Sequence, residues 1–133
     1  MHWLLDTDVC IAILREHAPT LERVRAESPA DLAIASMTEA ELRFGALRSS
    51  NPAAGEARID ALLSAPIAVL PFDRAAARRY AEVRQALRRA PIGNPDLVIA
   101  STALANGLRM VTGNVREFSR VPGLDVETWG EMA

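Results

Sequence analysis

The stretch from Pro91 to Phe118 constrains the fold of this chain more than any other part of the sequence. It carries a helix signal, because Asn94 is expected to cap a helix, Asp96 falls in its first turn, and Gly107 suits the left-handed residue that ends it. The short segment 109–111 that follows is typical of a buried strand in a parallel sheet. A helix, a glycine stop and a buried strand in this order indicate an α/β fold.

Polar residues stand at both ends of this helix and strand pair. Asp96 lies where the helix begins, and a polar cluster follows the strand directly: Thr112, Gly113 and Asn114. In open α/β sheets, binding and catalytic sites form at the carboxyl ends of the strands and at the helix N-termini beside them. The sequence therefore indicates a functional site here.

Length and composition define the class of protein. Half of the 133 residues are hydrophobic, so we expect a single domain over residues 1–133 with its own core. The formal net charge of −2 argues against a protein that simply binds the nucleic-acid backbone. All 15 basic residues are Arg, which excludes any mechanism that needs a lysine, and the one cysteine, Cys10, is expected in the core. Residues 1–5 are too short for a signal peptide or a membrane span, so we expect a cytoplasmic protein.

Strands and helices alternate along the whole chain. The predicted strands cover residues 2–5, 31–35, 67–72, 109–111 and 124–126. The predicted helices cover 7–15, 20–27 and 74–89, the last capped by Asp73; others begin at Thr38, after Asn51, and after Asn94. In the helix from Thr38, residues Leu42, Phe44, Gly45 and Leu47 are expected to face the core. This alternation predicts a parallel sheet with helices on both faces.

Three carboxylates occupy equivalent places in this pattern. Asp6 follows the first strand, while Glu41 and Asp96 fall in the first turns of their helices. In a parallel sheet all three positions lie at the carboxyl edge, so we expect the side chains to converge. Carboxylates that converge repel one another and are stabilised by a hard cation, for which Mg²⁺ or Mn²⁺ is the natural choice.

Each acid also has a structural interpretation. Glu41 stands three residues after Thr38, and this spacing equally suits a capping box. Asp96 in a first helical turn often serves only as a partner of the helix dipole. Asp6 is harder to explain in this way, because an apolar strand gains no stability from ending in a charge.

Four motifs occur in order: LLDTDVCI, TEAELRFG, PIGNPDLVIASTALANG and MVTGNVREFSRVPGL, with a closing Trp. Together they resemble the motifs of PIN-domain ribonucleases of the VapC toxin family, over essentially the whole chain. The resemblance implies a PIN-like three-layer sandwich with a five-stranded parallel sheet flanked by helices. It also implies a Mg²⁺- or Mn²⁺-dependent endoribonuclease that cleaves RNA, a homodimer, and a VapB-type antitoxin whose tail blocks the site.

The resemblance also assigns residues. The family's acids correspond to Asp6, Glu41 and Asp96, and a weaker fourth position corresponds to Asn114, as a weak ligand or a donor to the ligands. The sequence departs from the family in two places. Asp8 stands where the family often has Asn and adds negative charge, while Asn114 is neutral where the family has an acid, which leaves a second metal open.

Two alternatives remain at this point. Asp6-Thr7-Asp8 after a strand resembles the nucleophile loop of haloacid-dehalogenase-type phosphatases, although those enzymes ordinarily use a lysine and this chain has none. The other alternative is a PIN-like module that binds a partner without catalysis. Metal binding at millimolar concentration distinguishes this module from the nuclease.

Overall fold

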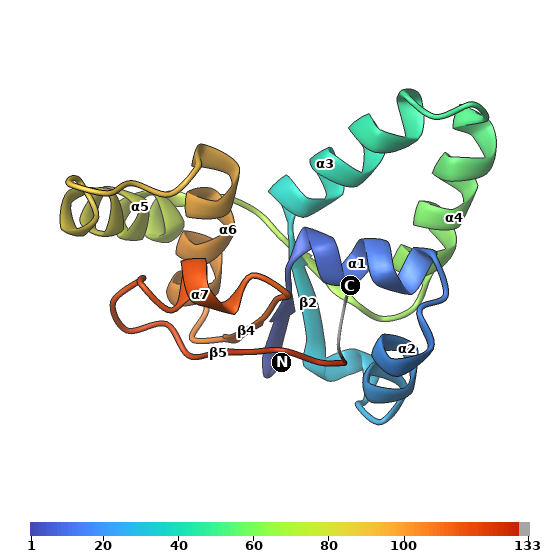
Figure 1. Ribbon diagram of the computed structural model, residues 1–133, viewed down its shortest axis with the longest axis horizontal. Coiled ribbons are helices and arrows are strands. Elements are labelled where there is room, and N and C mark those ends of the chain that lie inside the picture. The colour runs from blue at the N-terminus through green and yellow to red at the C-terminus, as the bar shows by residue number, and fades with distance from the viewer. Residues whose placement is uncertain (131–133) are drawn as a thin grey trace.

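A five-stranded parallel sheet forms the centre of the computed structural model, which describes residues 1–130 (Figure 1). The strand order is β3-β2-β1-β4-β5, and every neighbouring pair is parallel. The strands are β1 (Trp3–Leu5), β2 (Leu32–Ala35), β3 (Ala68–Leu70), β4 (Arg109–Val111) and β5 (Val126–Glu127). The predicted parallel sheet is confirmed, although the third strand is shorter than expected and the last lies two residues later in the chain.

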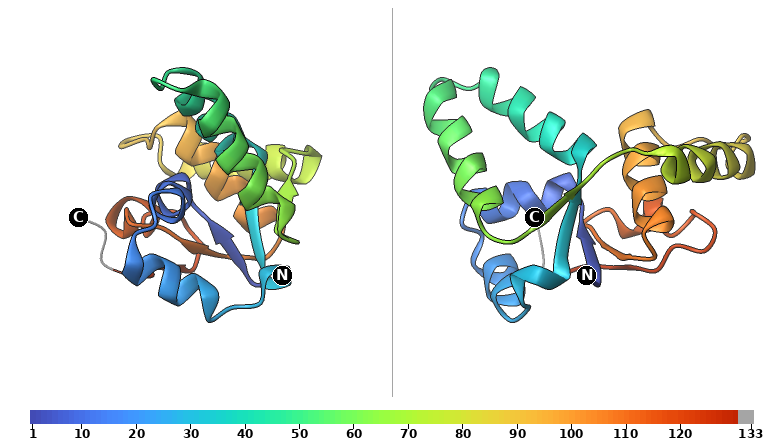
Figure 2. Two further views of the ribbon diagram at one scale, coloured as in Figure 1. Left: turned by 90° about the vertical axis from the view of Figure 1, so that its right-hand side faces the viewer. Right: turned by 180° about the vertical axis from the view of Figure 1, so that it is seen from behind.

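Helices cover both faces of the sheet. They are α1 (Thr7–Leu14), α2 (Ala18–Arg25), α3 (Ser36–Leu47), α4 (Pro52–Ser64), α5 (Arg74–Ala86), α6 (Asn94–Ala105) and α7 (Val115–Phe118), with a 3₁₀ turn at Pro29–Asp31. Helices α1 to α4 lie on one side of the sheet and α5 to α7 on the other (Figures 1 and 2). This arrangement is the expected three-layer sandwich. None of the helices within residues 1–130 is both long and apolar enough to cross a lipid bilayer.

Successive apolar residues of the three central strands, β2, β1 and β4, enter two separate hydrophobic clusters. In β1, Leu4 packs on the side of α5 and α6, and Leu5 packs on the side of α1 and α3. Met110 and Val111 of β4 divide in the same way. All four side chains are buried, because side chains alternate along a strand and helices cover both faces of this sheet. The strands therefore read as continuous apolar segments rather than alternating ones.

Several local signals act as predicted. Asn51 and Asp73 cap α4 and α5, and their side-chain oxygens accept hydrogen bonds from backbone N–H groups at 3.2 and 3.0 Å. Gly107 has a φ of 65°, which few other residues adopt without strain. Cys10 is buried in the core as expected, and burial raises the pKa of its thiol, so it is not a nucleophile.

Two helix starts differ from the prediction. Helix α3 begins at Ser36, with Ala35 at the N-cap position, so Thr38 is not a cap and Glu41 lies beyond the first turn. The capping-box interpretation of Glu41 is therefore wrong. Asn94 is not the cap of α6 either, because Gly93 holds that position and the Asn94 side chain instead accepts a hydrogen bond from the Tyr80 hydroxyl.

The predicted inward face of α3 is also partly wrong. Leu42 is buried, but Phe44 and Leu47 are 59% and 64% exposed. The cause is the way in which α3 leaves the sheet. Helices α3 and α4 form an antiparallel pair that projects from the sheet edge, so only one side of the C-terminal half of α3 meets the core (Figure 1). The remaining apolar side chains face solvent.

Candidate active site

Asp6 is placed at the carboxyl end of the central strand by its neighbours on both sides. It is the N-cap of α1, and its Oδ1 accepts a hydrogen bond from the Thr7 backbone N–H at 2.8 Å. Its Oδ2 accepts a hydrogen bond of 2.7 Å from the Thr112 hydroxyl, just beyond β4. The residue is only 5% exposed. Two opposed hydrogen bonds therefore fix the carboxylate in one orientation.

Glu41 is joined to this position through Thr7. The Thr7 hydroxyl lies 2.7 Å from Glu41 Oε1 and 3.1 Å from the hydroxyl of Thr38, which is itself buried. Glu41 thus reaches from α3 toward the start of α1, across 34 positions of the sequence. This contact explains a glutamate at the second turn of α3, where it contributes nothing to capping.

Asp96 lies in the first turn of α6, on the other side of the sheet, as predicted. Burial raises the pKa of its carboxyl group, and the negative charges of Glu41, Glu117 and Asp8 raise it further. A neighbouring charge raises the pKa of a carboxyl group noticeably only when it is near, so Asp96 lies near acids of α1, α3 and α7. The structure therefore brings together Asp6, Glu41 and Asp96.

Asn114 lies at the rim of this group rather than within it. It is exposed at the N-cap position of α7, and its backbone N–H donates to the Thr112 hydroxyl oxygen at 2.9 Å. Its side chain makes no capping bond. Asn114 and Asp8 line a common cavity of about 570 Å³, which also includes Gly113, Arg15 and His17.

Four other residues contribute to the site, of which the sequence had indicated Asp8 and Thr112 but had given no role to Thr7 or Glu117. Thr7 and Thr112 orient the acids, and Asp8 and Glu117 add negative charge. The position of Thr112 directly after β4 was a usable signal, and the DTD triplet marked Thr7 and Asp8. No pattern marked Glu117, because its approach to Asp96 depends on how α7 packs beside α6.

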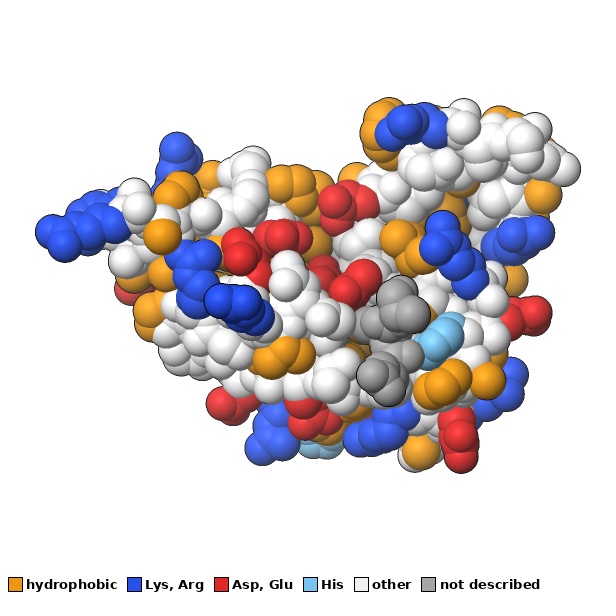
Figure 3. All heavy atoms as spheres, viewed as in Figure 1, with side chains coloured by type: hydrophobic (Ala, Val, Ile, Leu, Met, Phe, Trp, Pro, Cys, Tyr) orange, Lys and Arg blue, Asp and Glu red, His pale blue; other side chains and the backbone are white. Residues whose placement is uncertain are grey.

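The electrostatics of the site are dominated by negative charge. Burial raises the pKa of Asp6 to about 7; the hydrogen bond from Thr112 opposes this, and the charge of Asp8 adds to it. Within residues 1–130, no arginine or histidine forms a salt bridge with Asp6, Asp8, Glu41 or Asp96. Acidic side chains gather near the middle of this face, and arginines lie to either side (Figure 3). Among residues 1–130, no basic side chain therefore neutralises these four acids through a direct ion pair.

The donor set fits a hard divalent cation. Carboxylate oxygens are the ligands that Mg²⁺ prefers, and Asp8 Oδ1 is buried without a hydrogen-bond partner among residues 1–130. In the same range, no three His, Cys, Asp or Glu side chains already meet as a closed metal site. An open arrangement is compatible with Mg²⁺, which keeps several waters and uses one or two carboxylates. Mutual repulsion between acids that have no basic partner also favours such an open arrangement.

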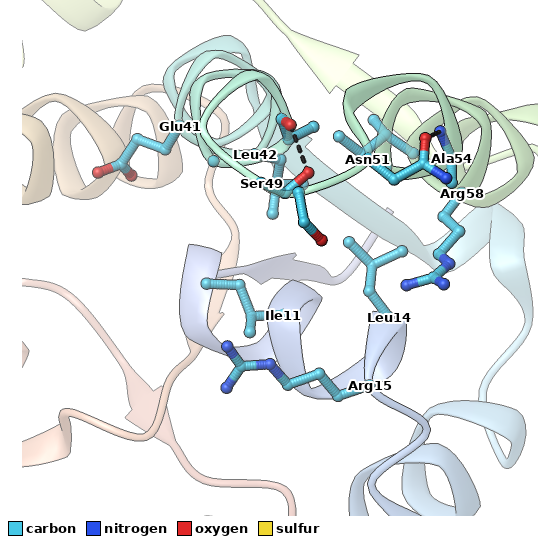
Figure 4. A pocket seen from close by; sticks show the side chains of 14 residues that line it. Ile11, Leu14, Arg15, Glu41, Leu42, Ser49, Asn51, Ala54 and Arg58 are labelled. Atoms are coloured by element: carbon cyan, nitrogen blue, oxygen red, sulfur yellow. Dashed lines mark hydrogen bonds between the residues drawn. The ribbon is translucent and has the colours of Figure 1, made fainter.

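A groove adjoins the site between α1, α3 and α4. It has a volume of about 400 Å³ and is lined mostly by apolar and small side chains, with Glu41, Arg15 and Arg58 among them. Glu41 lies at one end and Arg58 toward the other, with Ile11 and Leu14 between them (Figure 4). An elongated apolar segment therefore fits in the groove with one end beside the acids.

The chain is similar in sequence and in structure to known PIN-domain proteins. The PIN domain family model matches residues 3–124. The chain is 33% identical to Ribonuclease VapC2 of Rickettsia felis over 135 residues, covering 97% of this chain and 98% of the relative. It is 36% identical to the tRNA(fMet)-specific endonuclease VapC of Shigella flexneri over 131 residues, with the same coverage. The crystal structure of DNA-bound VapBC from Salmonella typhimurium superposes with a TM-score of 0.90 at 34% identity, covering 97% of this chain and 98% of that one.

Proposed function

The chain belongs to the PIN domain family as a ribonuclease of the VapC type, and on that premise we propose that Asp6, Glu41 and Asp96 hold the catalytic Mg²⁺ or Mn²⁺. Asn114 serves as a weak ligand or as a donor to the ligands, and residues 1–133 act as one domain in the cytoplasm. One observation carries the assignment. Asp6, Glu41 and Asp96 are buried or partly buried at one sheet edge, and none of these three carboxylates forms a salt bridge with an arginine or histidine of the described residues.

The protein's own residues position the reacting groups. The Thr7 N–H and the Thr112 hydroxyl hold Asp6 from two sides, and the Thr7 hydroxyl turns Glu41 toward it. When bound, the divalent ion supplies a water of lowered pKa for attack on the RNA phosphodiester and neutralises charge that develops on the phosphate. No lysine is available as a base, and none is needed in this scheme.

The family match removes the phosphatase alternative but not the alternative of a binding module without catalysis. The phosphatase alternative is replaced by the PIN domain match, which covers the Asp6-Thr7-Asp8 loop together with the rest of the site. A module that binds without cleaving has the same fold and differs only in chemistry. A cleavage assay separates this module from the nuclease.

The test is RNA cleavage by the purified full-length protein. We expect cleavage with Mg²⁺ or Mn²⁺, none in excess EDTA, and recovery when metal is restored. The 5′ ends of cellular RNAs are mapped after brief induction, with Asp6→Asn as the control. Initiator tRNA is the first substrate to examine, because the Shigella flexneri relative is named for it. Equal cleavage with and without EDTA contradicts the metal-based mechanism.

The partner of the chain is a VapB-type antitoxin, as the complexes among its structural neighbours indicate. The groove beside Glu41 suits an apolar segment of that partner, and an arginine from the segment neutralises the acids through its planar guanidinium. Expression of the chain alone should slow growth, and co-expression of the neighbouring small gene should restore it. Equal growth with wild-type and Asp6→Asn protein counts against a toxin.

Two copies of the chain form a homodimer in this proposal. Phe44 and Leu47 support it, because two large apolar side chains on one helix are more than half exposed. The molar mass of the full-length protein in solution, measured by light scattering after gel filtration, tests this point. A monomer at micromolar concentration contradicts it.

A further inference from the structure

Asp8 has one oxygen that the fold satisfies and one that it does not. Its Oδ2 accepts a hydrogen bond of 2.9 Å from the Gly113 backbone N–H, which ties the start of α1 to the loop after β4. Its Oδ1 is buried and has no hydrogen-bond partner among residues 1–130. Leaving a buried acceptor unsatisfied is costly, and the cost is larger for a charged group. An oxygen of this kind indicates a partner that is not a hydrogen-bond donor of the chain itself.

The surroundings of this oxygen define that partner. Asp6 and Asp8 stand two residues apart at the start of α1, and two ionised carboxylates cannot hydrogen-bond to each other. Neither forms a salt bridge with any basic side chain of the described range. A divalent cation bonds to both carboxylates at once and removes their repulsion.

The space beside Asp8 is large enough for a hydrated ion. The cavity of about 570 Å³ extends from Asp8 to Gly113 and Asn114, and Ile11, Ala12, Arg15 and His17 complete its lining. Asn114, in the loop after β4, offers at most a neutral amide oxygen. Asp8 is therefore the only carboxylate among the described residues that line this cavity.

We propose that Asp8 binds the divalent cation directly through Oδ1, beside Asp6, and so extends the metal site toward Gly113 and Asn114. The inference rests on the proposed metal-dependent function and adds one ligand to it. It also explains how a site with a neutral residue at position 114 retains enough negative charge on that side. In this proposal, Asp8 serves metal binding and not merely the stability of the N-terminus of α1.

The test measures the affinity of the full-length protein for Mn²⁺, through the electron paramagnetic resonance signal of the free ion. Asp8→Asn keeps an oxygen that accepts the Gly113 N–H but removes the charge. We expect its Kd to rise at least about tenfold, because altering groups that merely support metal ligands already costs that much. Asp60→Asn is the matched control, since it makes the same change at an exposed acid outside the site. Its Kd should equal that of the wild type.

A second variant covers the case in which Asp8→Asn does not fold. Asn114→Asp leaves Asp8 intact and adds a second carboxylate to the lining of the same cavity, so Mn²⁺ should bind more tightly, by several-fold. A Kd for folded Asp8→Asn equal to that of Asp60→Asn overturns the inference, and so does an unchanged Kd for Asn114→Asp if only that variant folds.

The affinity of Asp6→Asn separates this inference from the function on which it rests. If Asp6→Asn loses Mn²⁺ and Asp8→Asn does not, only the role of Asp8 fails. If Asp6→Asn and the wild type bind Mn²⁺ equally, the metal site itself fails.

Discussion

Two groups of acids on this chain differ in what neutralises them. Near the junction of α3 and α4, three carboxylates surround one guanidinium: Arg43 contacts Glu39 at 3.0 Å and Asp60 at 2.9 Å, and also pairs with Glu56. These contacts, with Asp60 as the largest cause, raise the pKa of Arg43. The second group is the active-site cluster: Asp6, Asp8, Glu41 and Asp96. It has no such arginine among the described residues.

We interpret this difference through the proposed function, in which the first group serves structure and the second serves catalysis. Asp60 has a side chain that is 67% exposed, so its charge costs little and its ion pair contributes little. Asp6 is 5% exposed, and burial is the largest cause of its raised pKa. The three acids of the first group are neutralised by Arg43. In the proposed function, the unfavourable electrostatic energy of the second group would be relieved by a bound cation, as expected where a site is prepared for a ligand.

Substitutions in the two groups of acids should differ most in their effect on the rate of RNA cleavage. We expect Asp96→Asn to lower RNA cleavage at least about a hundredfold, because the bound metal contributes several kcal/mol to transition-state stabilisation. Arg43→Gln, which breaks the other group, should leave the rate unchanged. Initial rates with one RNA substrate at saturating Mg²⁺ measure both. Undiminished cleavage by Asp96→Asn rejects the assigned site.

The second difference concerns stabilisation by metal. Mg²⁺ at about 100 times its Kd should stabilise the wild-type protein by about 2.7 kcal/mol. Asp6→Asn should lose most of this gain, and Asp60→Asn should keep all of it. Thermal unfolding in EDTA and in excess Mg²⁺ measures the shift in Tm for each protein. A full shift in Asp6→Asn means that the cation binds elsewhere.

A smaller effect is expected from pH in the metal-free protein. The pKa of Asp6 is about 7 in the folded state and near 3.8 when unfolded, so between these values only the folded protein holds the proton. Stability should therefore fall as pH rises from 4 to 7, by roughly 2 kcal/mol. Urea unfolding in EDTA at several pH values measures the slope. Asp6→Asn should flatten it, and a slope unchanged by this substitution contradicts the assignment.

The smallest effect is expected at Arg43. Its removal leaves three acids unpaired, but they lie near the surface and water replaces the lost partner. Arg43→Gln should lower Tm slightly, and less so at high salt, while the shift caused by Mg²⁺ stays the same. A large loss of stability would mean that the Arg43 group also holds α3 and α4 in place.

Prediction from sequence succeeded where the deciding interactions are local. Asn51 and Asp73 cap helices through backbone groups three residues away, and Gly107 needs only its own φ. It failed where two signals compete. Asn94 lies in a sequence that suits a cap, but Tyr80, 14 positions away, binds its side chain. Glu41 has the spacing of a capping box, but α3 begins two residues before Thr38.

The sequence by itself determined approximately where strands end and helices begin, because strand, helix and cap signals extend over only a few residues. It thereby placed Asp6 and Asp96 at the edge of a parallel sheet. Only the tertiary structure decided what these acids meet. The parallel pairing of β1 with β4 brings Thr112 to Asp6 across 106 positions and Gly113 to Asp8 across 105. Contacts of that range depend on strand order and register, which no local pattern contains.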